Sequence, residues 1–325
     1  MTDRSPSAVL AEAAEAAGFA PSVHNTQPWR WRVAGDRIDL LADRDRQLRL
    51  ADPEGRLLTM SCGAALHHAV VALAAEGATA QVERLPGPEH LARITLGEPT
   101  DVAPEAVRRF QALRVRHTDR RPVGDTPVAP EIIDVLLRIV TAYGIDCQVL
   151  NSDEVTELAV VCSQADFIEI MDPDQRLELA YWIGGERPEG TGVPDAALPA
   201  KAPGEMYPGR DFVRLGTLAT GDGADRAATY VVLFGQGDQP ADWLRAGEAM
   251  SACWLAATEQ GVSVLPFSAV IEVPSTREVL RRMLSGLGYP YLVLRLGIHQ
   301  STEPGPLHTP RLPAKQLIEV VAGTP

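Results

Sequence analysis

The sequence predicts an α+β fold built from two related halves, and three observations lead to that prediction. Segments with helical and strand periodicity alternate along all 325 residues. This length exceeds the roughly 100–200 residues usual for one domain, so two units or one large body are expected. One helix-and-strand pattern occurs near residues 62–97 and again near residues 246–297. Such a recurrence indicates an internal duplication.

The first unit, residues 1–105, begins with a helix whose ends can be read from the sequence. Ser5 can cap this helix, Pro6 suits its first turn and Gly18 ends it. The elements expected after it are a hairpin around residues 34–36, an apolar helix at 55–77 and strands at 78–85 and 91–97.

The second unit, residues 106–325, contains a long segment without periodicity. Residues 184–210, the lid segment, are rich in Pro and Gly, and at this length the segment is either disordered or a functional lid. Its apolar content favours a lid. The elements expected around it are helices at 130–144, 152–170, 241–261 and 275–288, and strands at 145–150, 228–235 and 289–299.

The duplication is clearest in two apolar helices, CGAALHHAVVALAAEG and AGEAMSACWLAATEQG. Gly63 and Gly77 in the first are spaced like Gly247 and Gly261 in the second, and alanines recur at matching positions. Chance similarity between alanine-rich buried helices is the alternative. If the duplication holds, we expect the halves to pack like the subunits of a homodimer, through an isologous-type interface.

Composition narrows the class of protein. Apolar residues make up 45% of the chain, which is ample for a packed core, and no apolar run approaches the roughly 20 residues of a membrane helix. The net charge of −13 disfavours general binding of nucleic acids or anionic membranes. Four isolated cysteines and an N-terminus without a visible secretory signal predict a cytoplasmic protein with free thiols.

Residues 20–29, APSVHNTQPW, form a polar turn that concentrates hydrogen-bonding groups. Ser22, Asn25 and Gln27 offer short polar side chains near exposed backbone N–H groups, next to an apolar tryptophan. A flat ligand with polar edges needs that combination. A helix end leading into a strand, with His24 and Asn25 bonded to local backbone, explains the same residues equally well.

Residues 114–123, RVRHTDRRPV, form the most basic stretch of an acidic chain. A phosphate needs several charge-assisted donors that converge on one point, and Arg supplies them as a planar fork. Arg116, Thr118 and Arg120 would point the same way in an extended backbone. A solvated basic loop is the alternative. Arg311 in the tail segment HTPRLPAKQL is a further candidate for the same anion.

Other common sites lack their sequence patterns. GQGDQP fails the dinucleotide-binding fingerprint, and there is neither a P-loop lysine nor a GxSxG elbow. His67 and His68 are adjacent on a helix and point to different faces, whereas chelation needs a spacing of three or four. We expect no metal site.

The polar turn closely resembles the SPSxxNxQPW signature of the flavin-dependent nitroreductase family. RHTDRRP resembles the family's Arg-x-Ser-x-Lys phosphate motif, with Arg116, Thr118 and Arg120 at matching positions. Typical members carry the phosphate motif first, in a shorter chain that forms an intertwined dimer. The inverted order here is similar to the Acg-like single-chain branch, in which two such units are fused and the second flavin site has decayed. DPEGRLLTMSCGAALHHAVVAL, WLRAGEAM and TPRLP extend the resemblance over residues 8–317.

The resemblance implies one FMN per chain and assigns residues to its two ends. Residues of the polar turn face or support the isoalloxazine ring, and basic residues hold the phosphate and ribityl end. The ring residues are Ser22, Val23 and Asn25, with Gln27 as a brace, and the phosphate residues are Arg116, Thr118, Arg120 and Arg311, with His117 adjacent.

A third matching stretch, GVSVLPFSAV, departs from the family pattern. The family has a loop here that lies near the flavin N5 edge, and Pro266 is kept. Ser268 stands where glutamate is common, and Ala269 where glycine is common. This departure weakens the case for ordinary reduction by a nicotinamide. The lid segment matches the lid that the Acg-like branch folds over its flavin.

The resemblance implies an FMN-dependent oxidoreductase that uses NAD(P)H and a nitroaromatic or quinone acceptor. The flavin would carry the redox chemistry by hydride transfer, so no catalytic side chain is assigned. The alternative is an FMN-binding or FMN-sequestering protein with little turnover, which the lid segment and Ser268 favour. A structural protein that has lost its flavin is a third possibility. The chain is expected to be a monomer or a loose homo-oligomer.

Overall fold

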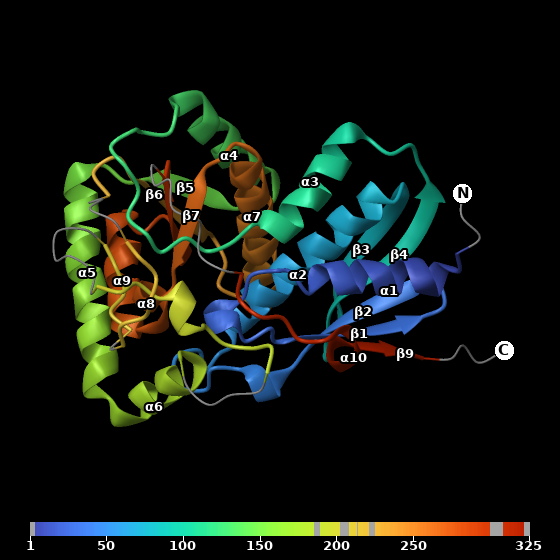
Figure 1. Ribbon diagram of the computed structural model, residues 1–325, viewed down its shortest axis with the longest axis horizontal. Helices are drawn as coiled ribbons and strands as arrows, with labels where there is room; N and C mark the ends of the chain where they lie inside the picture. The colour runs from blue at the N-terminus through green and yellow to red at the C-terminus, as the bar shows by residue number, and fades with distance from the viewer. Residues whose placement is uncertain are drawn as a thin grey trace.

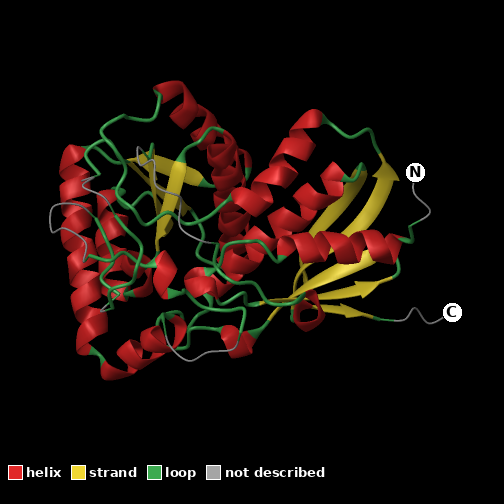
Figure 2. Cartoon of the chain, viewed as in Figure 1, coloured by secondary structure: helices red, strands yellow, loops and turns green. Residues whose placement is uncertain are grey.

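The computed structural model describes residues 4–184, 189–201, 208–212, 214–220, 225–299 and 308–321. Two separate, mainly antiparallel sheets with flanking helices make the protein α+β, as predicted (Figure 2). Helices α2 (Arg56–Ala75) and α7 (Pro240–Glu259) lie side by side between the two sheets (Figure 1). The core of the molecule is therefore organised around one helix pair.

The first half follows the predicted order closely. Ser5 caps the first helix, since its Oγ accepts a hydrogen bond from the Ala8 N–H at 3.3 Å. The elements besides α2 are α1 (Pro6–Ala17), η1 (Val23–Asn25), β1 (Trp29–Ala34), β2 (Arg37–Ala42), η2 (Arg44–Arg46), β3 (Ala78–Gly87) and β4 (His90–Pro99). Helix α3 (Pro104–Val115) follows at the junction of the two predicted units.

The second half contains elements that the sequence analysis did not assign. Among these are the edge strand β7 (Ser263–Phe267), in the stretch matched to a loop, and helix α6 (Pro173–Trp182). The other elements are α4 (Pro130–Ala142), β5 (Asp146–Val149), α5 (Ser152–Met171), η3 (Asp195–Ala197), β6 (Thr229–Gly235), α8 (Ala269–Glu272), α9 (Pro274–Met283), β8 (Tyr289–Gly297), α10 (Ala314–Leu317) and β9 (Ile318–Val320).

The order of strands repeats between the two sheets. The first sheet has the order β3-β4-β2-β1-β9, and the second, read in the same sense, has the order β7-β8-β6-β5. Along the chain, α2 follows β2, the third strand of its sheet, and precedes β3, the first. In the same way, α7 follows β6, the third strand of the second sheet, and precedes β7, the first. This agreement supports the duplication inferred from the helix sequences. The C-terminal β9 pairs in parallel with β1, so the end of the chain joins the sheet of the first half.

Helices α2 and α7 cross at two glycines, each of which contacts the backbone of the other helix. A Cβ added to Gly63 would lie 2.1 Å from the Leu244 carbonyl oxygen, and one added to Gly247 would lie 1.9 Å from the Met60 carbonyl oxygen. These contacts are reciprocal, because Met60 and Gly63 occupy the same repeat positions as Leu244 and Gly247. The crossing therefore has the symmetry of an isologous interface.

A hydrogen bond marks the axis that relates the halves. His67 Nδ1 lies 2.9 Å from Ser251 Oγ, and these residues are 184 positions apart, the same separation as Gly63 and Gly247. Residues at equivalent positions contact each other only near a two-fold axis. A pseudo-two-fold axis thus passes between α2 and α7 at this pair.

Helix α2 differs from the sequence expectation in one respect. Of the described helices, it is long and apolar enough to cross a membrane by length and composition, although no such run was expected. In the structure 89% of its apolar window is buried inside the protein. Its composition reflects burial on nearly all sides between the two halves.

The glycine crossing predicts that Gly247→Ala destabilises the protein. Alanine normally stabilises a helix by about 1 kcal/mol relative to glycine. Here the new methyl group would overlap a backbone oxygen, so we expect a loss of about 2 kcal/mol or more in the free energy of unfolding in urea. Gly144→Ala is the control: its φ is +74° and its added Cβ meets no atom within 4 Å, so a cost of about 1 kcal/mol is expected. Unchanged or increased stability of Gly247→Ala would contradict the close crossing.

Candidate functional site

The polar turn joins α1 to β1 through an unusual backbone. His24, Asn25 and Gln27 have φ values of 44°, 56° and 50°. This left-handed conformation costs a non-glycine residue roughly 1–2 kcal/mol. Strained residues persist where the surrounding structure fixes them. The turn is held in this conformation by hydrogen bonds to the lid segment, the C-terminal tail and α2.

Gln27 ties the polar turn to two distant segments. Its side chain is completely buried. Nε2 donates to the Gly190 carbonyl of the lid segment at 2.7 Å, and Oε1 accepts from the Leu312 N–H of the C-terminal tail at 3.0 Å. Gln27 N–H itself donates to Ser22 Oγ at 2.9 Å. Gln27 and Ser22 thus brace the turn internally and against its neighbours.

Val23 and Asn25 complete the anchoring of the turn. The Val23 N–H donates to Ser61 Oγ on α2 at 3.2 Å. Asn25 Nδ2 donates to the carbonyls of Gly192 and Pro310, at 3.0 and 2.9 Å. Its Oδ1 accepts from an Arg311 guanidinium nitrogen at 3.0 Å. Asn25 is therefore, with Gln27, a contact of the turn with both the lid segment and the tail.

Two arginines from opposite ends of the second unit meet beside the polar turn. Arg116 and Arg311 both donate to the Phe19 carbonyl, at 3.2 and 3.3 Å. The Arg116 guanidinium carbon also lies 4.5 Å from the centre of the Trp254 ring. We call Arg116 and Arg311 the arginine pair.

Arg116 is buried and Arg311 is half-buried, and neither forms an ion pair with a carboxylate of the described residues. Burial, and then the charge of Arg311, lower the pKa of Arg116 to about 9, and burial lowers the pKa of Arg311 to about 10. The Nε atoms of both residues are buried and have no hydrogen-bond partner in the described part of the chain. Uncompensated buried charge is costly. The arrangement can hold a small anion, which would satisfy both groups.

The other candidates of the basic stretch make different contacts from the arginine pair. Arg120 donates to the Ala197 carbonyl of the lid segment at 3.1 Å, so it does not join the arginine pair at Phe19. His117 Nδ1 lies 3.1 Å from the Val115 carbonyl, and its ring is half-buried. Thr118 is also half-buried.

A second charged cluster surrounds Arg210, at the end of the lid segment. Arg210 forms two hydrogen bonds with Glu272, at 2.7 and 2.9 Å, and one with Glu169 at 2.9 Å. Its guanidinium also lies 3.4 Å from Ser268 Oγ. Glu272 lies one helical turn after Ser268. A buried carboxylate is therefore present close to the position where the family commonly has glutamate and this chain has Ser268. Pro266 lies half-buried in β7, where it pairs with a residue of β8.

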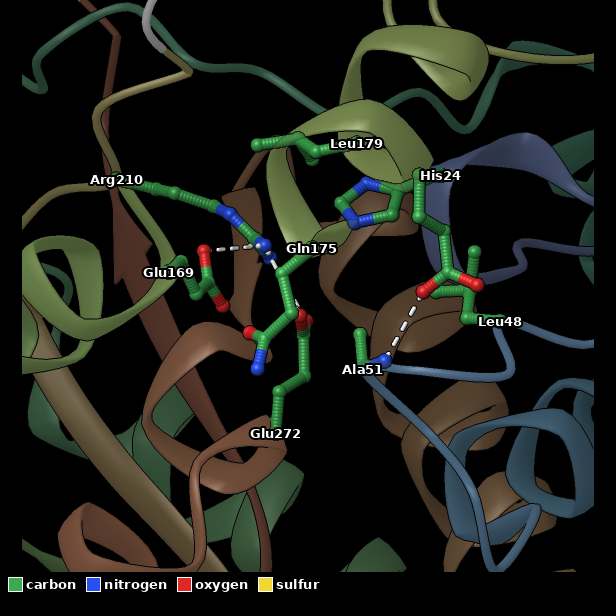
Figure 3. Close-up of a pocket in the computed structure, with 9 residues that line it drawn as sticks. His24, Leu48, Ala51, Glu169, Gln175, Leu179, Arg210 and Glu272 are labelled. Carbon is green, nitrogen blue, oxygen red and sulfur yellow. Dashed lines mark hydrogen bonds and ion pairs between the residues drawn. The ribbon is translucent and has the colours of Figure 1, made fainter. Parts of the chain in front are cut away.

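His24 faces a cavity next to this cluster. The cavity is small, with room for about one water molecule, and His24, Glu169 and Glu272 are among its lining residues (Figure 3). His24 Nε2 and Glu169 Oε1 are buried and have no hydrogen-bond partner in the described structure. Burial, and then the charge of Arg210, lower the pKa of His24 to about 3. The imidazole is therefore neutral at physiological pH.

Much of the lid segment is ordered against the rest of the protein. Residues 189–201 include η3 and two isolated bridges, Ile183 with Val193 and Pro199 with Leu218. Trp182, Ile183, Val193 and Leu198 form a small apolar cluster with Leu48 of the first half. Residues 185–188 and 202–207 of the predicted lid lie outside the described residues.

Several residues of the site were missed by the sequence analysis. They are the Phe19 carbonyl, His24 as a cavity residue, Glu169, Arg210, Trp254 and Glu272. A backbone carbonyl and a buried tryptophan carry no sequence signal of their own. Glu272 could have been predicted from the sequence, because a carboxylate one helical turn after Ser268 can occupy the same region.

The buried imidazole predicts a specific acid sensitivity. Between about pH 6 and pH 4 the unfolded chain binds a proton at His24 and the folded chain does not, so stability falls as the pH falls by about 1.4 kcal/mol per pH unit for this group. His24→Asn keeps a residue that tolerates positive φ and removes the titrating group. Urea unfolding at several pH values should give a shallower slope for the variant by that amount. Parallel pH curves for the two proteins would show that His24 is charged or exposed in the folded state.

Sequence relatives of the chain occur in Mycobacterium tuberculosis H37Rv. The chain is 36% identical over 308 residues to "Putative NAD(P)H nitroreductase Rv3131", covering 92% of this chain and 88% of that protein. It is 34% identical over 325 residues to "Putative NAD(P)H nitroreductase acg", covering 97% and 96%. It is 30% identical over 311 residues to "Uncharacterized protein Rv3127", covering 93% and 90%.

Solved structures show a more distant likeness. A nitroreductase with bound FMN from Desulfitobacterium hafniense DCB-2 has a TM-score of 0.42 and 13% identity, covering 66% of this chain and 98% of that one. A nitroreductase with bound FMN from Bacteroides fragilis NCTC 9343 has a TM-score of 0.38 and 11% identity, covering 60% and 90%. No family model matches the sequence. Because its similarity to the Rv3131 and acg proteins extends over more than nine tenths of its length, the chain belongs to the nitroreductase family, in the Acg-like branch.

Proposed function

We propose that the protein binds one FMN between its two halves and acts as an NAD(P)H-dependent oxidoreductase on a nitroaromatic or quinone acceptor. The observation that carries this proposal is the arginine pair next to the polar turn, whose two Nε atoms are buried and have no carboxylate partner among the described residues. The relatives named for NAD(P)H nitroreductase activity support the same function.

The residues present suit the phosphate end of FMN. A phosphate monoester carries nearly two negative charges and three acceptor oxygens, which charge-assisted bonds from arginine satisfy well. Arg116 and Arg311 each retain a buried Nε without a partner in the described chain. We assign the phosphate to this pair. Arg120, His117 and Thr118 lie nearby in sequence and are assigned to the ribityl side.

The polar turn suits the ring end. Asn25 and the backbone of Ser22 and Val23 provide polar groups in a turn that the contacts of Gln27 hold in place. Pro266 on β7 and Ser268, the residue before α8, are assigned to the same end. When bound, FMN supplies hydride transfer, which no side chain of the protein provides. The protein's own contribution is to fix the ring, exclude water through the lid segment and place hydrogen-bond donors at its edge.

One site per chain follows from the distribution of the two motifs. The polar turn lies in residues 1–105 and the basic stretch in residues 106–325, and neither recurs in the other half. We propose these two ranges as the units of the fused pseudo-dimer, with the C-terminal β9 returning to the first sheet. We further propose that the protein is a monomer or a loose homo-oligomer and that it is located in the cytoplasm.

A second candidate function is sequestration of FMN with little turnover. It is favoured by the lid segment, whose Gly190 and Gly192 are hydrogen-bonded to Gln27 and Asn25 of the polar turn. A lid fixed at the ring loop would restrict access of a nicotinamide.

Anaerobic mixing of the FMN-loaded protein with NADPH separates the two functions. Bleaching of the flavin absorbance within seconds is expected for the reductase. Retention of the oxidised spectrum for an hour would reject the reductase and leave sequestration. A purified protein that is colourless and fails to take up added FMN would reject both.

The arginine pair predicts that Arg116→Ala weakens FMN binding. The loss of a charge-assisted contact of about 1.5–3 kcal/mol should raise the dissociation constant by roughly 10–100-fold in a fluorescence titration. The stability of the protein without FMN should not fall in proportion, because an uncompensated buried charge is removed. Arg108→Ala, an exposed arginine on α3 paired with Glu105, is the matched control. An unchanged dissociation constant for Arg116→Ala would place the phosphate elsewhere.

A further inference from the structure

His68 on α2 is a buried histidine to which the proposed function gives no role. Its side chain is completely buried, and both of its ring nitrogens lack a hydrogen-bond partner in the described structure. Its neighbour His67 is also buried, but His67 Nδ1 has Ser251 Oγ as a partner at 2.9 Å. Buried polar atoms in native proteins normally have partners, and leaving one without a partner is costly. The ring of His68 therefore indicates a place for a polar group that the described residues do not supply.

The position of His68 along α2 puts it on the side of the helix that contacts the polar turn. Ser61, whose Oγ accepts a hydrogen bond from the Val23 N–H, lies seven residues before His68. Residues seven apart share one face of an α-helix, and here they are separated by about 10 Å along its axis. His67 belongs to the neighbouring face, which packs against α7. His68 thus extends the face of Ser61 next to the contact with α7.

The arginine pair contacts the elements on both sides of this face. Arg116 and Arg311 meet at the carbonyl of Phe19, which lies between the end of α1 and the polar turn. Helix α1 packs along α2 (Figure 1). The Arg116 guanidinium also lies against the ring of Trp254 on α7, the other helix that packs on α2. Arg116 therefore joins the two elements between which His68 is buried.

The charges that act on His68 are those of the arginine pair. Burial is the main cause that lowers the pKa of His68, and the charges of Arg116, His67 and Arg311 act in the same direction. The imidazole is therefore neutral at physiological pH, with one nitrogen that donates a hydrogen bond and one that accepts. A group that accepts a hydrogen bond and carries negative charge suits both the N–H of this ring and the two guanidinium groups.

Three side chains from three parts of the chain present buried nitrogens without partners among the described residues. They are Arg116, which follows α3, Arg311 of the tail, and His68 of α2. A phosphate group has three oxygens that accept charge-assisted hydrogen bonds, and nearly two negative charges. A water molecule would satisfy a nitrogen of His68 but would leave the charges of both arginines uncompensated. A phosphate oxygen satisfies the donor and the charges together.

We propose that His68 is a third binding residue of the anion site formed by the arginine pair, where its imidazole N–H donates a hydrogen bond to a phosphate oxygen. His68 thereby contributes to the preference for a phosphorylated flavin over the unphosphorylated one. This inference rests on the proposed binding of FMN. The same three residues would hold a free phosphate ion by the same chemistry, and the experiment distinguishes the two sources of the phosphate.

The test compares FMN with riboflavin, which has the same ring and ribityl chain and no phosphate. Both are titrated by fluorescence against the flavin-free protein and its His68→Leu variant. Leucine is similar in size to histidine and has no polar atom, so the variant should bind FMN about tenfold more weakly and riboflavin with unchanged affinity. Without ligand, its stability in urea should be unchanged or higher, because a buried polar group without a partner is replaced by an apolar one.

Two further variants separate the hydrogen bond from the fold. His68→Gln keeps a side-chain N–H donor, so most of the affinity for FMN should be retained. His67→Leu is the matched control, because His67 is the adjacent buried histidine of α2 and contacts Ser251 instead. This control should leave the ratio of the FMN and riboflavin affinities as it is in the original protein.

The outcomes distinguish this inference from the proposed function. If His68→Leu binds FMN as tightly as the original protein does, the role of His68 is wrong while the flavin function stands. An equal loss of affinity for FMN and riboflavin would also overturn it, because the effect would then not depend on the phosphate. Calorimetry with inorganic phosphate provides a measurement without flavin. If the flavins fail to bind but phosphate binds about tenfold more weakly to His68→Leu, the anion site stands and the flavin function fails. If neither FMN nor phosphate binds, both are rejected.

Discussion

The close crossing of α2 and α7 is the constraint on which the rest of the structure depends. Gly63 and Gly247 allow each helix to reach the backbone of the other, since a Cβ added at either glycine would lie only 2.1 or 1.9 Å from the facing carbonyl oxygen. No larger residue fits at either position without moving a helix. This contact fixes the relative position of the halves. A site assembled from both halves needs such a rigid joint, since small displacements would separate its parts.

The charges around the polar turn favour ligand binding over stability. Arg116 is buried beside the half-buried Arg311, and no carboxylate among the described residues forms an ion pair with either of them. In a purely structural core such a pair would be replaced by apolar residues or matched with acids. Elsewhere the same protein does match its buried arginines, as Arg210 with Glu272 and Arg295 with Asp225 show. The difference between these environments is the strongest physical argument for an anionic ligand.

The sequence predicted the elements whose causes are local. The capped α1, the β1–β2 hairpin and the long apolar helices follow from capping residues, turn residues and periodicity, and the structure confirms them. Strand β7 was missed because its proline is typical of a loop, and only its position at the sheet edge makes the proline acceptable. Arg120 was expected beside Arg116 from strand alternation. It instead reaches the lid segment, because residues 116–123 do not form a strand. Contacts between the lid segment, tail and polar turn depend on tertiary structure and have no local signal.

The strained backbone of the polar turn explains how one short segment serves two environments. His24 and Asn25 both have positive φ, and their side chains face different neighbours: Asn25 contacts Arg311, and His24 lines the cavity with Glu169. One neighbour region is positively charged and uncompensated, whereas the other is acidic. A regular helix or strand would not present these adjacent residues to both regions at this position. The roughly 1–2 kcal/mol of strain per residue is offset by the hydrogen bonds of Gln27 and Asn25. The turn thereby places Asn25 beside two arginines without carboxylate partners and His24 beside a cluster with an excess of carboxyl groups.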